Sequence, residues 1–129
     1  MYKVLIVAAL SFGIATGAAA GTTPSETAKP IADSPRSLGY NAIASGNLSA
    51  AEHMLGSDEL LAANDPARLL NLGYIYMRTG RINDARRLYQ LVRDSGDHFM
   101  VELADGRLMD SREVAEIALR RLPTTLAQR

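Results

Sequence analysis

The chain has 129 residues, with 14 Lys and Arg, 14 Asp and Glu, and no Cys. This length suits one small domain, and 47% apolar with 22% charged residues is the composition of a folded chain rather than a disordered one. The absence of Cys excludes disulfides and Cys-based zinc sites, and the balanced charge argues against a general nucleic-acid-binding protein.

Residues 1–20 have the pattern of a secretory signal peptide. Lys3 supplies a positive charge, residues 4–17 are uncharged, and small residues precede Gly21. We expect cleavage after Ala20 and no stable membrane insertion afterwards. Because Arg outnumbers Lys twelve to two, a bias typical of high-GC bacterial genomes, the expected location is the periplasm. The alternative is a retained anchor, although a spanning helix needs about 20 strongly apolar residues.

Residues 21–35 are rich in Thr, Ser and Pro and contain few side chains that could be buried. This composition predicts a flexible tether. The folded part is therefore expected to start near Pro35.

An internal repeat follows the tether. Leu38–Gly39–Tyr40 aligns with Leu72–Gly73–Tyr74. The same offset aligns four further pairs, namely Gly46 with Gly80, Leu48 with Ile82, Ala51 with Ala85, and Leu55 with Tyr89. Identities at the small positions, where packing is most demanding, indicate two related structural units.

Each unit has the pattern of a helical hairpin. The first copy predicts helices over 38–45 and 48–55, an interruption near Gly56, and a short continuation over 58–61 capped by Ser57. In the second copy, Asp65–Pro66 starts a helix that Gly80 ends, and an amphipathic helix over 82–92 follows. Small residues such as Gly73 let the two helices approach closely, so Gly73→Leu should break this hairpin by overpacking.

The period does not continue into a third copy. Residues 98–110 centre on Asp105–Gly106, which is the strongest two-residue signal for a β-hairpin. Residues 111–123 predict a helix with a capping box at Asp110, ended by Pro123. Its expected inward-facing residues are Val114, Ile117, Ala118 and Leu122. Because repeat stacks usually need about three units, either this terminal unit completes the core or a second molecule does.

The second copy resembles a tetratricopeptide repeat. The residues that match the family pattern, in order, are Leu69, Leu72–Gly73, Tyr76, Gly80, Ala85 and Tyr89. The resemblance implies two helical hairpins, a degenerate repeat over 36–64 and a second repeat over 65–97. With the small β-hairpin over 98–110 and the C-terminal capping helix over 111–123 that the residue pattern predicts, the expected fold is mainly all-α.

The resemblance also implies a partner-binding groove along the first helix of each hairpin. We call this surface the helix-A face, and its residues are Tyr40, Ile43, Leu70, Tyr74, Met77 and Arg78. Tyr offers apolar area and a hydrogen bond, Met adapts to irregular surfaces, and Arg binds a carboxylate or carbonyl. The alternative is that Tyr40 and Tyr74 pack against each other or under the tether.

Motifs for catalysis, cofactors or metals are absent from the sequence. His53 and His98 lie far apart along the chain, without the spacing of paired ligands on one helix. The carboxylate pairs, at Asp58–Glu59, Asp94–Asp97 and Asp105–Asp110, each fit a helix start or a turn. We interpret Arg86–Arg87 and Arg120–Arg121 as solvated helix surface, because acidic residues accompany both pairs.

Together with these patterns, the resemblance implies a non-catalytic adaptor of the bacterial envelope that binds a segment of another protein or a peptide. One alternative is a self-assembling or obligate structural subunit. A further alternative is a small hydrolase-like or carbohydrate-binding module that uses the carboxylates.

Overall fold

The computed structural model describes residues 39–57 and 63–124. The expectations for the signal peptide, the tether, Leu38 and the continuation over 58–61 lie outside these residues.

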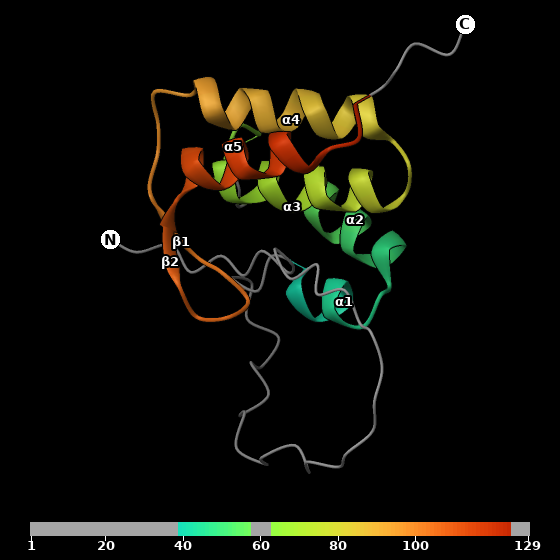
Figure 1. Cartoon of the computed structure of the whole chain (residues 1–129). Coiled ribbons are helices and arrows are strands. Elements are labelled where there is room, and N and C mark those ends of the chain that lie inside the picture. The colour runs from blue at the N-terminus through green and yellow to red at the C-terminus, as the bar shows by residue number, and fades with distance from the viewer. Residues whose placement is uncertain (1–38, 58–62, 125–129) are drawn as a thin grey trace, which may run out of the picture.

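The described chain is mainly helical with one small antiparallel sheet (Figure 1). This confirms the predicted fold class at that level. The elements, in chain order, are α1 (Tyr40–Ala44), α2 (Leu48–Ser57), α3 (Pro66–Arg78), α4 (Ile82–Asp94), β1 (Met100–Glu102), β2 (Leu108–Asp110) and α5 (Ser111–Arg121).

Consecutive helices pack side by side in an array. α1 lies against α2, α2 against α3, α3 against α4, and α5 contacts both α4 and α3. The β-hairpin separates α4 from α5 along the chain and lies at one end of these helices (Figure 1). The helix after the hairpin therefore takes the place next to the second pair.

The two helix–turn–helix corners stand at equivalent positions of the sequence repeat. Gly46 and Gly80 have left-handed φ values of 77° and 80°. Their amides donate to the carbonyls of Ile43 (3.0 Å) and Met77 (3.3 Å). The next bonds in each turn are Asn47 N–H to Ala42 O (2.8 Å) and Arg81 N–H to Tyr76 O (2.8 Å). Together they form a Schellman motif, in which glycine accommodates the positive φ without a Cβ clash.

The start of α3 shows why this helix forms where the sequence predicts. Asp65 is buried, and its Oδ1 accepts hydrogen bonds from the amides of Ala67 (3.0 Å) and Arg68 (3.2 Å). Pro66 occupies the first turn, where its missing N–H costs nothing. The predicted N-cap is therefore confirmed.

Gly73 lets α3 and α4 approach closely. A Cβ added at Gly73 would lie 2.5 Å from Cε1 and 2.9 Å from Cζ of Tyr89, which is closer than carbon atoms can pack. The ring of Tyr89 fills the space that the missing side chain leaves. The absence of a side chain at Gly73 therefore sets the distance between the two helices.

Two details of the first helical pair differ from the sequence expectation. Gly39 does not lie inside a helix but is the N-cap of α1, with φ of 75°, so α1 begins only at Tyr40. α2 is not interrupted near Gly56; it continues to Ser57, whose Oγ donates back to the carbonyl of His53 (2.8 Å). A serine hydroxyl near a helix end satisfies the backbone of its own helix as readily as it caps a new one.

The β-hairpin also differs in its turn. Leu103 N–H donates to the carbonyl of Arg107 (2.7 Å), and Gly106 N–H donates to the carbonyl of Leu103 (2.8 Å). The loop therefore has three residues, 104–106, rather than the two of Asp105–Gly106. Gly106 supplies the left-handed position, with φ of 81°, that such three-residue loops require.

One core cluster joins the helical pairs to the terminal unit. Val101 and Leu103 of the hairpin region and Val114 and Ala115 of α5 are buried in the same cluster as the helical residues. Of the residues expected to face inward from α5, Val114, Ala118 and Leu122 pack in or against this cluster, but Ile117 is only half-buried outside it. The terminal unit thus contributes to the core that the repeats begin.

Candidate functional site: the exposed part of the helix-A face

The helix-A face is divided by burial. Ile43 and Leu70 are 5% and 0% exposed, whereas Tyr40, Tyr74 and Met77 are half-buried. Arg78 is exposed. We therefore remove Ile43 and Leu70 from the predicted binding surface. Leu70 belongs to the core cluster that includes the hairpin and α5, and α5 packs on α3. The buried first half of α3 therefore offers little open surface to a partner.

Three residues of α3 remain as one accessible patch, which we call the α3 patch: Tyr74, Met77 and Arg78. They stand at positions i, i+3 and i+4, so they share one side of the helix. Tyr40, at the position equivalent to Tyr74, lies on α1, which packs against α2. The structure therefore places the predicted residues on two helices and concentrates three of them near the C-terminal end of α3.

Tyr74 is also part of the packing between α3 and α4. Burial raises the pKa of Tyr89, and the neighbouring Tyr74 adds to this increase. Tyr74 packs against the core cluster while part of its side chain remains exposed. Tyr74 thus packs against the core with part of its surface. The alternative from the sequence named Tyr40 and the tether instead, and the tether lies outside the described residues.

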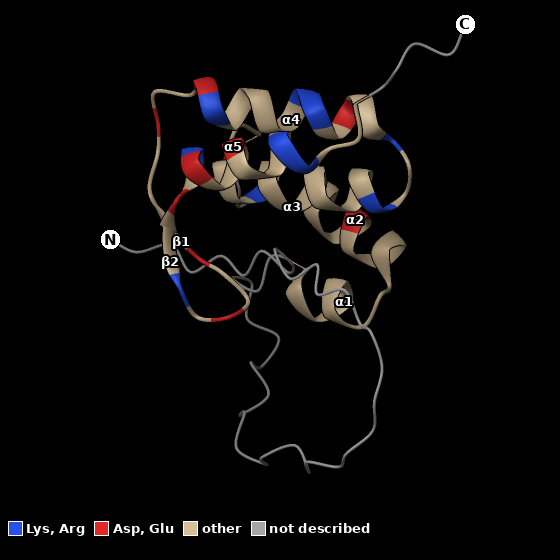
Figure 2. Ribbon diagram, in the orientation of Figure 1, with Lys and Arg blue, Asp and Glu red and all other residues tan. Residues whose placement is uncertain are grey.

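The charges on α1 and α3 differ from those elsewhere. α1 has no charged residue, and α3 carries Arg68 and Arg78 without any acid. By contrast, α4 and α5 display acidic and basic residues together (Figure 2). Together, α1 and α3 therefore carry two positive charges and no negative charge.

Arg78 stands apart from the other arginines. In residues 39–57 and 63–124 it is the one arginine without an ion pair, a hydrogen bond or another polar partner. Arg87, for comparison, is exposed and pairs with Asp84 at 3.6 Å. A guanidinium with five donors and no acceptor among the described residues is available for an external anion.

Glu52 and Arg86 occupy equivalent positions in the two copies of the repeat. Each makes a polar contact with the unit that follows. The Glu52 carboxylate of α2 lies 2.7 Å from Arg81 at the start of α4, and the Arg81 guanidinium lies 3.9 Å from the ring centroid of Tyr76. Arg86 Nη2 donates to the carbonyl of Pro123 (3.1 Å), beyond α5. The equivalent position therefore contacts the following unit in both copies.

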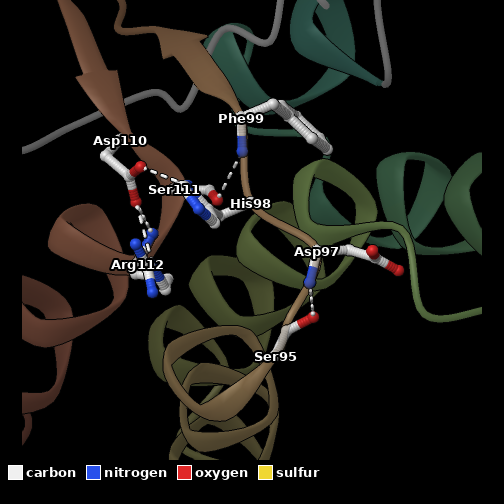
Figure 3. A network of polar contacts seen from close by, with 7 residues as sticks. All are labelled: Ser95, Asp97, His98, Phe99, Asp110, Ser111 and Arg112. Carbon is white, nitrogen blue, oxygen red and sulfur yellow. Dashed lines mark hydrogen bonds and ion pairs between the residues drawn. The ribbon is translucent and has the colours of Figure 1, made fainter.

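A polar cluster fastens the β-hairpin to α5 (Figure 3). His98 Nδ1 lies 2.7 Å from Asp110 Oδ2, and Asp110 Oδ1 accepts the amide of Arg112 (2.9 Å). Partial burial raises the pKa of Asp110, but the Arg112 amide and the His98 ring favour the carboxylate, and the net effect lowers this pKa. Asp110 thus caps α5 and closes the hairpin at once.

Sequence reasoning missed this cluster because it treated His98 as isolated. The signal was present in the hairpin spacing. Met100 pairs with Asp110 in the sheet, and His98 lies two residues before Met100. Because side chains alternate along an extended chain, the His98 side chain lies on the same face as that of Asp110. Knowledge of the register would have predicted the contact.

The cluster brings a serine next to the histidine and the aspartate, the residue types of a hydrolase triad. Ser111 is 0% exposed, and its Oγ accepts the amide of Phe99 (3.4 Å), while its own amide donates to the Phe99 carbonyl (3.0 Å). A substrate cannot reach this hydroxyl in the observed conformation. We interpret the arrangement as a structural joint.

The remaining carboxylates considered for chemistry also have local roles. Asp94 lies 2.7 Å from Arg93, whose hydrogen bond lowers the pKa of Asp94. Asp105 accepts the amide of Arg107 (3.1 Å) and then its side chain (2.7 Å), and these bonds lower the pKa of Asp105. Asp58–Glu59 lies outside the described residues.

Within the described ranges, no group of three or more His, Cys, Asp or Glu could hold a metal ion. The helices in those same ranges are also too short or too polar to cross a membrane. His53 is exposed on α2.

Comparisons with protein-family models, with curated proteins and with solved structures found no match to this chain.

Proposed function

We propose that this chain is a non-catalytic adaptor built from tetratricopeptide-like hairpins, which binds a segment of another protein through the exposed part of the helix-A face. The observation that carries the proposal is the α3 patch, where half-buried Tyr74 and Met77 adjoin Arg78, which has no polar partner among the described residues. Aromatic, Met and Arg side chains are the residues enriched in protein interfaces.

The repeated corner supports the family resemblance. Turns with the same hydrogen bonds at Gly46 and at Gly80 are the geometry expected of a tandem helical repeat. The N-terminal pattern favours export, so the proposed place of action is the bacterial periplasm.

Photo-crosslinking in the native host tests this function. A photoreactive phenylalanine analogue replaces Tyr74, and a matched variant carries the same group at Arg87, whose side chain is 76% exposed on α4. We expect a discrete partner to be captured at position 74 and not at position 87. Equal capture at both positions, or capture at neither, would contradict the proposed surface.

A second candidate function is self-assembly, and the hairpin favours it. Met100 and Leu108 are 38% and 53% exposed. In the register they alternate with Val101 and Met109, so both side chains lie on the outer face of the sheet. Light scattering at micromolar concentration distinguishes the two functions. Self-assembly predicts a molar mass greater than that of one chain, and Leu108→Lys should lower this mass.

A further inference from the structure

We propose that the segment bound at the α3 patch is acidic: a short peptide that places an apolar side chain against Tyr74 and Met77 and a carboxylate on Arg78. This inference rests on the proposed function and specifies the chemistry of the partner.

The first argument is the unused capacity of Arg78. The other arginines in the described ranges contact a carboxylate, a carbonyl or another interacting group. Within those ranges Arg78 has no such partner, although it stands in the last turn of α3, within reach of solvent. Planar guanidinium groups bind carboxylates through two parallel hydrogen bonds, which gives both strength and orientation.

The second argument is charge complementarity. α1 and α3 contain no acidic residue, so a bound carboxylate meets no like charge on these helices. Asp65, which caps α3, stands at the opposite end of this 13-residue helix, roughly 20 Å from Arg78 at 1.5 Å per residue. A basic segment would instead meet Arg78 without a compensating acid on the same helix, and like-charge contacts select against such partners.

The third argument is the neighbourhood of the charge. Tyr74 and Met77 are half-buried and pack on the core cluster, so they are held in place and still offer apolar surface one turn from Arg78. A peptide in which an acidic residue lies next to an apolar one can place its carboxylate on Arg78 and its apolar side chain on Tyr74 and Met77. Burial of the apolar side chain also lowers the local dielectric constant and strengthens the ion pair.

Arg78 also occupies a position where a structural role is expected. A cation in the last turn of a helix interacts favourably with the negative end of the helix dipole and so stabilises the helix. That role predicts a loss of stability when Arg78 is replaced but no change in which peptides bind. The two roles are therefore separable by measuring unfolding and binding on the same variants.

The test uses a phage-displayed library of random peptides selected against the protein purified from its host. We expect the selected peptides to contain Asp or Glu close to an aromatic or aliphatic residue. Arg78→Gln should weaken a selected peptide about tenfold, and so should replacing its Glu by Gln. Combining both changes should cost little more than either alone. Arg87→Gln is the matched control and should bind normally, while Arg78→Glu should select basic peptides.

Selected peptides without acidic residues, or equal binding to Arg78→Gln, would overturn the inference. If such peptides still lose affinity with Tyr74→Ala, the adaptor function stands and only the acidic partner is wrong. Failure to select any peptide would count against both. Denaturant unfolding of each variant shows whether a loss of binding comes from a loss of fold.

Discussion

The first and second helical pairs share one corner but differ in the helices that flank it. α1 and α3 end at equivalent positions of the repeat, Ala44 and Arg78, and the turns that follow use the same hydrogen bonds. Yet α1 has five residues and α3 has thirteen. The comparison teaches that the turn is specified by a few local residues, whereas helix length depends on what caps and covers the helix.

Glycine shows the same contrast. Gly39 and Gly73 occupy equivalent positions, but Gly39 has a left-handed φ of 75° and an added Cβ would meet Ala51 at an ordinary 3.6 Å. Gly73 is helical, and an added Cβ would collide with the Tyr89 ring. In the first pair Leu55 stands at the position of Tyr89. Glycine thus allows a left-handed backbone conformation in the first copy and close packing of two helices in the second.

The largest effect is expected from overpacking the second pair. Gly73→Leu should lower the free energy of unfolding by about 3 kcal/mol, because the added side chain would collide with the buried Tyr89 ring. Gly73→Ala should also lower the free energy of unfolding relative to the wild type, although alanine has a helix propensity more favourable than that of glycine by roughly 1 kcal/mol. In a Tyr89→Leu background, which imitates the first pair, the effect of Gly73→Ala should change sign. Urea unfolding measures all of these variants, and an unchanged sign would contradict this explanation.

The cap of α3 is the next largest contribution. Asp65→Ala should lower the free energy of unfolding by about 1–2 kcal/mol, since two amide donors lose their acceptor. Asp65→Asn is the matched control and should keep most of the stability, because Asn caps helices nearly as well. α1 has no side-chain cap, so no equivalent loss can be produced there. A large loss with Asp65→Asn would show that charge, not capping, matters.

Hydrogen exchange should show that the first pair opens more readily. Asn47 N–H and Arg81 N–H make equivalent bonds of 2.8 Å, but the first closes a five-residue helix and the second a thirteen-residue one. We expect Asn47 to be at least about tenfold less protected, because short helices with few buried residues open locally. Equal protection in an NMR exchange experiment would mean that the two pairs unfold as one unit.

The terminal unit is fastened partly by the charge of Asp110. Because the pKa of Asp110 is lowered in the folded protein, its contribution is present above the unfolded-state pKa of about 3.9 and is lost as pH falls through the folded value. The urea midpoint should therefore fall from pH 5 to pH 3. Asp110→Asn should reduce this fall without abolishing it, since Asp94 and Asp105 shift in the same direction. An identical pH profile for the variant would contradict the role of Asp110.

The smallest effect is expected at the contact between the pairs. Glu52→Gln removes the ion pair with Arg81, which lies at the surface, where such pairs add little. Its effect on the urea midpoint should be smaller than that of Asp65→Ala. Glu116→Gln, which breaks an i, i+4 pair with Arg120 inside α5, is the matched control. A larger effect for Glu52→Gln than for the control would show that the contact between units matters.

Local patterns predicted the fold elements well. The Asp65–Pro66 start, the turn glycines and the hairpin around Gly106 each depend on hydrogen bonds within a few residues, so the sequence contains the whole signal. The start of α1 was predicted wrongly, because the first helix was placed by analogy with the better-matching copy. Gly56 was interpreted as a helix break, but it lies within α2. The candidate site was predicted less well: of its six residues, Ile43 and Leu70 are in the core.

The sequence alone determined the period of the repeat, the corner turns, the cap of α3 and the mainly helical class, because these follow from local backbone hydrogen bonding and the spacing of apolar residues. Tertiary structure decided the rest. Docking of α5 on α3 accompanies the burial of Leu70, the strand register brings His98 to Asp110, and the placement of the described acids leaves Arg78 unpaired among them. Burial and charge pairing depend on which distant segments meet, and the spacing of residues along one chain does not contain that information.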